Sequence, residues 1–182
     1  MKAFKKICTA LMLLAFAFVF ASCSNGSDSD DDDDQSITLS DGSYTVAITQ
    51  TSDGMVEKYD IKATASNESW TFKSGSKTET VDLTKKMGPD KLADFNKKNY
   101  DEKKAMAKEN MEFPDDAEVS FDNNKVIVKS TLSAAELTEM QKNYQLSSIP
   151  SDAKIETITD KTEYEITMSK EWGTIVFHVN KD

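Results

Sequence analysis

Apolar and polar residues alternate with a period of two in the first part of the chain that follows residue 40. The segment 44–48 has a large apolar residue at every second position, with small or polar residues between them. Because alternate side chains of a strand lie on the same face, this pattern predicts a half-buried β-strand. The pair Asp53-Gly54 is typical of a two-residue hairpin turn, and the alternation resumes over 59–65. The sequence therefore predicts a β-hairpin here.

Two further alternating segments follow this hairpin. Trp70 and Phe72 alternate with polar residues in the first, and Val81 and Leu83 do so in the second. Between them, the run Ser74-Gly75-Ser76 has the small and flexible residues that are typical of a turn. The whole region is therefore predicted to form a meander of about four antiparallel strands.

Helix signals begin after this meander. Pro89 and Asp90 suit the first turn of a helix, because proline needs no backbone partner there and a carboxylate complements the helix dipole. A solvated helix is predicted from there to about residue 110. Ser133 and Glu136 have the spacing of a capping box, which predicts the start of a second helix. The apolar residues expected on its buried face are Leu137, Met140 and Tyr144.

Five shorter strands complete the predicted set. They are expected over 117–121 and 125–132, between the two helices, and over Lys154–Thr159, 163–168 and 174–179 at the end of the chain. This order of elements predicts an α+β fold class: a mostly antiparallel β-sheet with two helices packed on one face. Because a helix separates two groups of strands, the order of elements also allows one parallel pair of strands.

The chain begins with the three-part pattern of an export signal. Lysines come first, the uncharged run 7–20 follows, and the segment Phe20-Ala21-Ser22-Cys23 ends it with small residues before a cysteine. This start resembles the bacterial lipoprotein signal, which commonly has leucine where this chain has Phe20. The resemblance implies that residues 1–22 are removed and that Cys23 carries acyl chains such as palmitate. Each buried acyl methylene contributes roughly 0.8 kcal/mol, so several chains would hold the protein on a membrane.

Two alternatives concern the same segment. A membrane-spanning helix is disfavoured, because the uncharged run reaches only about 24 Å and the hydrocarbon core needs about 30 Å. A plain secretory signal that is cut after Ala21 is the other alternative. The following residues are polar and rich in aspartate, which is typical of a flexible tether. The expected organisation is a signal peptide at 1–22, a lipidated Cys23 with an acidic Ser/Asp tether at 23–35, and a single α+β domain at 36–182.

Charge and cysteine content narrow the range of partners. The full chain has a formal net charge of −10 at pH 7, and all of its 22 basic residues are lysines. Since the chain is acidic and lacks the planar guanidinium that suits phosphate recognition, we expect no nucleic-acid partner. An anionic lipid surface also repels such a domain, so the membrane contact is expected through Cys23 alone. Removal of Cys8 with the signal peptide leaves no disulfide within the mature chain.

Candidate catalytic and metal-binding residues all have structural explanations. His178 is the only histidine, and no further ligands follow a recognisable metal-site spacing. The aspartates within 28–34 lack the spacing of a calcium-binding loop. Acidic pairs suit acid and base catalysis, but those of this chain fit a solvated helix, a helix end and the outer side of a strand. These pairs are Asp101 and Glu102, Asp115 and Asp116, and Glu163 and Glu165. We therefore predict no catalytic residue, metal or cofactor.

The expected function is that of a membrane-anchored lipoprotein of the bacterial cell envelope. It is expected to be non-enzymatic, with a domain that makes protein contacts or has a structural role. Ser24, in place of an aspartate after Cys23, favours the outer membrane over the inner one. The alternative is a carrier or sensor that holds a small apolar or amphipathic ligand between sheet and helices. The aromatic residues available for such a groove, unless they fill the core, are Tyr44, Tyr59, Trp70, Phe72, Trp172 and Phe177.

The lipidation of Cys23 is directly testable. Cys23→Ala removes the only sulfur to which acyl chains can be attached in the mature chain, so we expect an unlipidated precursor or a released protein. Metabolic labelling with a fatty acid analogue should mark the wild-type chain and leave the variant unlabelled. Equal labelling of both chains would contradict the anchor.

Overall fold

The computed structural model describes residues 37, 39–66, 69–111, 113–144, 149, 152–159 and 162–182. The predicted signal peptide, Cys23 and the acidic tether lie outside the described residues. Ile37 and Leu39 are buried against the larger hydrophobic cluster of the fold, directly before the first strand.

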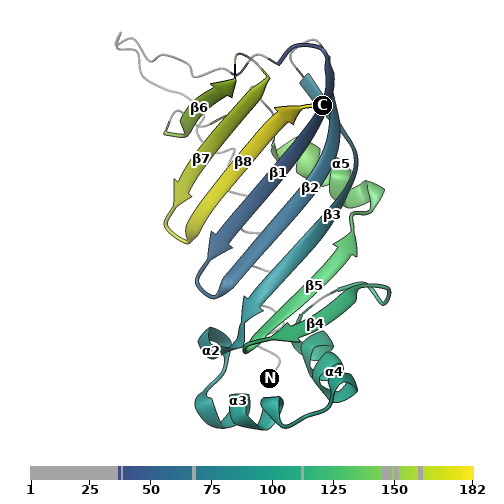
Figure 1. The fold of residues 1–182 in the computed structure, drawn as a ribbon, viewed down its shortest axis with the longest axis vertical. Helices are drawn as coiled ribbons and strands as arrows, with labels where there is room; N and C mark the ends of the chain where they lie inside the picture. Colours follow the sequence, from purple (N-terminus) through teal and green to yellow (C-terminus); the bar gives the residue numbers. More distant parts are fainter. Residues whose placement is uncertain are drawn as a thin grey trace, which may run out of the picture.

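An eight-stranded sheet forms the body of the molecule (Figure 1). Its strands are β1 (Gly42–Ser52), β2 (Met55–Ser66), β3 (Ser69–Asp82), β4 (Glu118–Asp122), β5 (Lys125–Thr131), β6 (Lys154–Thr159), β7 (Glu163–Lys170) and β8 (Gly173–Lys181). Their order across the sheet is β4-β5-β3-β2-β1-β8-β7-β6. Every described pair of neighbours is antiparallel, so the parallel pair left open by the sequence does not form. The predicted hairpin at Asp53-Gly54 is confirmed as the β1–β2 turn.

The predicted turn at Ser74-Gly75-Ser76 is wrong, because β3 runs through it as one strand of 14 residues. The first part of the chain therefore forms three long strands and not four. A β-carbon at Gly75 would lie 2.9 Å from the backbone oxygen of Asp60, so glycine permits a close approach of two strands here. The pairing register of β2 and β3 shifts beside this point, between Lys62 and Ala63.

Four helices are present in the described part of the chain. They are α2 (Leu83–Lys86), α3 (Pro89–Asn96), α4 (Tyr100–Asn110) and α5 (Ala134–Asn143). The single helix predicted from Pro89 is divided, because Asn99 forms a capping box with Glu102 and starts a new helix. Leu83, expected in a strand, begins α2, and the Asp82 carboxylate accepts the Thr84 backbone N–H at 2.9 Å. The predicted capping box that starts α5 is confirmed.

The predicted antiparallel β-sheet with helices is confirmed, and strands make up most of the fold, whereas the helices are not clearly packed on one face. Figure 1 shows α2, α3 and α4 gathered at one end of the sheet, while α5 lies behind β2 and β3. The breaks after α2 and α3 fold three short helices together at the end of the sheet. One long helix along the strands would have been needed to cover the face.

Buried apolar side chains form two groups on the sheet. The first hydrophobic cluster joins α5 to the central strands and to β7 and β8, and includes Val46, Ile48, Ile61, Trp70, Leu137, Met140, Tyr164 and Phe177. The second hydrophobic cluster lies at the end where α2, α3 and α4 gather, and includes Val81, Leu83, Phe95, Ala107, Val119, Val126 and Val128. Helical residues belong to both clusters, so each cluster has its own helices that shield it from solvent.

Ile48 provides a test of the first cluster. Its side chain is fully buried on the central strand β1, whereas Ile158 on the edge strand β6 is 52% exposed. Ile48→Ala should lower the free energy of unfolding by about 2–5 kcal/mol, since it leaves a cavity. Ile158→Ala, the matched control, should change it by less than about 0.5 kcal/mol. Denaturant unfolding of the full chain measures both, and similar losses would contradict the assignment of the core.

Candidate functional site

A row of buried polar side chains crosses three neighbouring strands. Gln50 of β1 pairs in register with Glu57 of β2, which pairs with Glu79 of β3. All three are less than 9% exposed, and they make up the buried polar residues of the described chain. Burial of a carboxylate is costly unless it is paired, so this row requires specific partners. We call Gln50, Glu57, Glu79 and their partners the polar row.

Lys77 is the cation of the polar row. Its Nζ lies 2.6 Å from Glu57 Oε1 and 3.1 Å from Glu79 Oε2. The side chains are largely buried: the exposed fractions of the side chains alone, without the backbone, are 13% for Lys77, 6% for Glu57 and 10% for Glu79. One ammonium group is therefore shared by two buried carboxylates.

Tyr144 connects the other end of the polar row to α5. Gln50 Nε2 donates to the Tyr144 hydroxyl at 2.6 Å, and Trp70 Nε1 donates to the Tyr144 backbone oxygen at 2.6 Å. The Tyr144 ring also meets Phe177 edge to face in the first hydrophobic cluster. These contacts fix the end of α5 against the sheet.

The protonation states follow from burial and from the two carboxylates. Burial raises the pKa of Glu79. The attraction of Lys77 lowers this pKa and the repulsion from Glu57 raises it, and the net shift is upward. Burial alone would lower the pKa of Lys77, but the carboxylates of Glu79 and Glu57 outweigh it and raise that pKa. Burial, and then the charge of Glu57, also raise the pKa values of Tyr59 and Tyr144. Lys77 is therefore charged and both tyrosines are neutral at pH 7.

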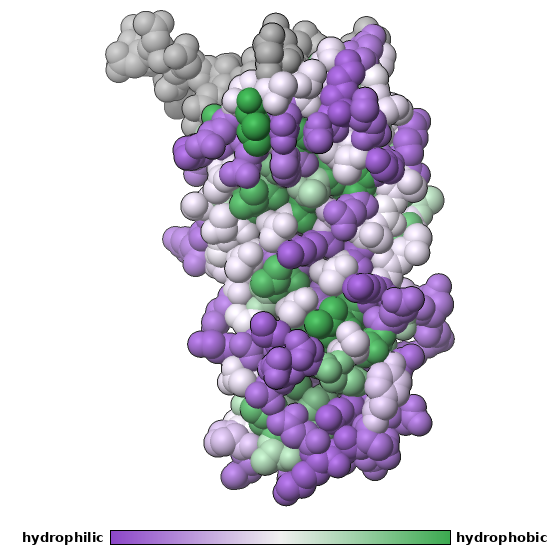
Figure 2. All heavy atoms as spheres, in the orientation of Figure 1, coloured by the Kyte–Doolittle hydropathy of each residue, from purple (hydrophilic) through white to green (hydrophobic). Residues whose placement is uncertain are grey.

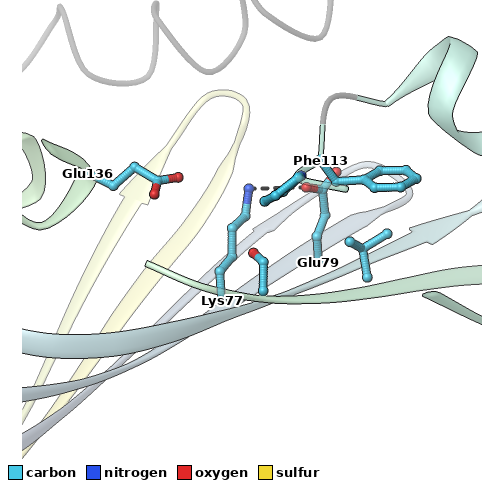
Figure 3. A pocket seen from close by; sticks show the side chains of 7 residues that line it. Lys77, Glu79, Phe113 and Glu136 are labelled. Atoms are coloured by element: carbon cyan, nitrogen blue, oxygen red, sulfur yellow. Dashed lines mark ion pairs between the residues drawn. The ribbon is translucent and has the colours of Figure 1, made fainter. Parts of the chain in front are cut away.

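An open hollow of about 350 Å³ lies over one end of the polar row. Lys77 and Glu79 line it together with Val128 and Ser130 of β5. The other lining residues are Phe113 and Pro114, from the connection between α4 and β4, and Glu136, from the first turn of α5. Figure 3 shows Lys77 between Glu79 and Glu136, with Phe113 beside Glu79. The hollow thus combines an apolar wall with an ammonium group and carboxylates.

The structure does not bring the sequence-predicted acidic pairs together as a site. Asp101 and Glu102 lie in the first turn of α4, where Glu102 belongs to the capping box. Asp115 forms an ion pair with Lys108, and Asp116 is exposed. Glu163 and Glu165 are partly exposed on β7. These positions agree with the structural explanations that the sequence analysis favoured.

His178 forms a hydrogen bond with Glu163 on β7. Its Nε2 lies 2.8 Å from Glu163 Oε1, and this hydrogen bond lowers the pKa of Glu163. In the described part of the chain, no group of three or more His, Cys, Asp or Glu side chains could hold a metal ion. Among the described helices, none has both the length and the apolar character that crossing a membrane requires.

The aromatic residues pack in the core. Tyr44, Tyr59, Trp70, Phe72 and Phe177 are buried in the first hydrophobic cluster, and Trp172 is partly buried against it. The charged residues of the polar row were missed, although the sequence held a signal for them. Glu57 is in phase with the buried positions of β2, and Lys77 and Glu79 are in phase with Val81. A charged residue at such a position predicts a buried ion pair.

Comparison of the chain with protein-family models, with curated proteins and with solved structures finds no match.

The shared ammonium group of Lys77 provides a test of the polar row. Lys77→Met leaves two buried carboxylates without a cation and should lower the free energy of unfolding by about 3–5 kcal/mol. Lys129→Met, which removes an exposed lysine from β5, is the control and should cost less than about 0.5 kcal/mol. The loss should shrink as the pH is lowered, since protonation neutralises the carboxylates and the raised pKa of Glu79 favours its early protonation. Urea unfolding at several pH values measures this.

A rescue variant separates charge from packing. Glu57→Gln and Glu79→Gln, added to Lys77→Met, remove the uncompensated charges and should recover most of the lost stability. Failure of this rescue would show that the lysine stem, and not its charge, supports the fold.

Proposed function

We propose that this chain is a lipid-anchored, non-enzymatic protein of the bacterial cell envelope, whose sheet binds another protein. The support for the anchor is the export signal that ends at Cys23 and the acidic tether behind it. Ser24 after the cysteine favours the outer membrane. The tether would hold the domain away from the anionic headgroups, where an acidic surface is not repelled.

The observation that carries the proposed protein contact is an uncharged band on the second face of the sheet, which is the face opposite the polar row. Register places seven uncharged residues side by side across seven strands, and all are partly or fully exposed. This uncharged band consists of Ser120, Ile127, Thr80, Val56, Thr51, Thr174 and Ser169. Charged residues make up 30% of the chain, and none of the seven positions of this row is charged.

Depletion of charged residues at the centre and a polar rim are two features of protein-binding surfaces. Lys125 and Lys129 flank Ile127 of the band on β5, one on each side, and Glu163 and Glu165 lie on β7, on the same face as Ser169 and before it in the strand. Figure 2 shows uncharged and apolar residues over the middle of the face that the sheet presents in Figure 1, with hydrophilic residues around and between them. Because α5 lies behind β2 and β3, and α2, α3 and α4 gather at one end of the sheet, this second face is left for a partner. The expected occupant is a different protein with a flat, uncharged surface.

Site-specific photocrosslinking in cells tests this contact. A photoreactive residue in place of Thr80, within the uncharged band, should form an adduct with another envelope protein. The same residue in place of Thr138, an exposed position on α5, should not. Adding Val56→Lys and Thr174→Lys should weaken the Thr80 adduct roughly tenfold, since each buried charge opposes association by about a kcal/mol or more.

Two outcomes would count against the proposed contact. Equal adducts at Thr80 and Thr138 would show that the band has no preference over the rest of the surface. An adduct of twice the mass of the chain would identify a second copy as the occupant, and would replace the proposed partner with self-association.

A second candidate function is that of a small-molecule carrier, and the hollow at Lys77 and Glu79 favours it. Its volume of about 350 Å³ falls within the roughly 300–1,000 Å³ of common ligand pockets. The hollow is open and partly charged, so it suits an amphipathic ligand better than a purely apolar one. The sequence predicted a small apolar or amphipathic ligand, and the hollow favours the amphipathic one.

A further inference from the structure

We propose that the hollow binds an amphipathic organic cation, with its ammonium or guanidinium group beside Glu79 and its apolar part against Phe113 and Pro114. This inference rests on the second candidate function, that of a small-molecule carrier, and names the ligand class. It is independent of the protein contact through the uncharged band.

The charge balance around the hollow favours a cation. Among the described residues that line it, Lys77 is the one cation, Glu79 and Glu136 are acids, and Glu57 contacts Lys77. The two buried carboxylates share a single ammonium group, so one negative charge is left over between them. A carboxylate can accept about four hydrogen bonds, so Glu79 can hold Lys77 and a ligand cation together. A second cation would offset the repulsion between Glu57 and Glu79.

An anionic ligand fits the same hollow poorly. The Lys77 ammonium group already contacts Glu57 and Glu79 at 2.6 and 3.1 Å, so an anion would have to compete with both. It would also approach the like charges of Glu79 and Glu136, which line the hollow beside Lys77. Repulsion between like charges is strongest where water is partly excluded. The arrangement therefore favours a positively charged ligand over a negatively charged one.

The apolar wall defines the remainder of the ligand. Phe113, Pro114 and Val128 provide aromatic and aliphatic surface within the same hollow as Glu79. Phe113 is partly exposed and packs at the edge of the second hydrophobic cluster. An apolar group against this wall would lose water contact, and the aromatic face would attract a nearby cation. A short aryl or alkyl amine carries a charged group and an apolar group close enough together to contact Glu79 and the apolar wall at the same time.

Titration of the full lipidated chain in detergent micelles tests the inference with three matched probes. The probes are 2-phenylethylammonium, the neutral 2-phenylethanol and the anionic 3-phenylpropanoate, and ligand-observed NMR measures their binding. We expect the ammonium probe to bind at least tenfold more tightly than either of the others. Glu79→Gln should weaken the ammonium probe about tenfold or more, since a charged hydrogen bond is lost. Glu139→Gln, an exposed change on α5, is the control and should have no effect.

Glu136→Gln provides a second variant in case Glu79→Gln fails to fold, because Glu136 is exposed at the start of α5. It should weaken the ammonium probe by roughly twofold to fivefold, as expected for a partly solvated charge. Circular dichroism checks that each variant is folded. Equal affinity for the alcohol and the ammonium probe would overturn the cation preference while leaving a carrier of neutral ligands. Absence of binding by all three probes would count against both the carrier and the cation site.

Discussion

The length of the strands is the constraint on which the rest of the structure depends. β3 has 14 residues and extends roughly 46 Å at about 3.3 Å per residue. α5 has 10 residues and covers only roughly 15 Å at about 1.5 Å per residue. One short helix cannot cover a face of this length, so the buried apolar residues divide into two clusters with separate helices. The polar row and the hollow lie between α5 and the helices that shield the second hydrophobic cluster.

This gap explains why charged residues occur on the buried side of the sheet. Apolar side chains lining the open hollow between α5 and the α4–β4 connection would face solvent, whereas isolated charges beneath it would be poorly solvated. Lys77 resolves the conflict, because one flexible ammonium group can contact Glu57 and Glu79 at once. The same compromise leaves an excess of negative charge beside an open hollow. The requirements of the fold thus produce the chemistry on which a cation site would depend.

Local signals in the sequence predicted most of the fold. Asp53-Gly54 and the capping box of Ser133 set their turn and helix directly, since both act through neighbouring residues. Gly75 was misread as a turn, because its close approach to Asp60 arises only when β2 and β3 pair. The polar row was missed for a similar reason. Lys77 lies opposite Tyr59 and Glu79 opposite Glu57 only in the formed sheet, and this register is a long-range property.

Strand β3 relates the two proposed binding surfaces. Lys77 and Glu79 point to the side of the hollow, and Thr78 and Thr80 alternate with them on the side of the uncharged band. The two surfaces therefore share one strand but have no side chain in common. A protein on the band would leave the hollow open, and a small cation in the hollow would leave the band unchanged.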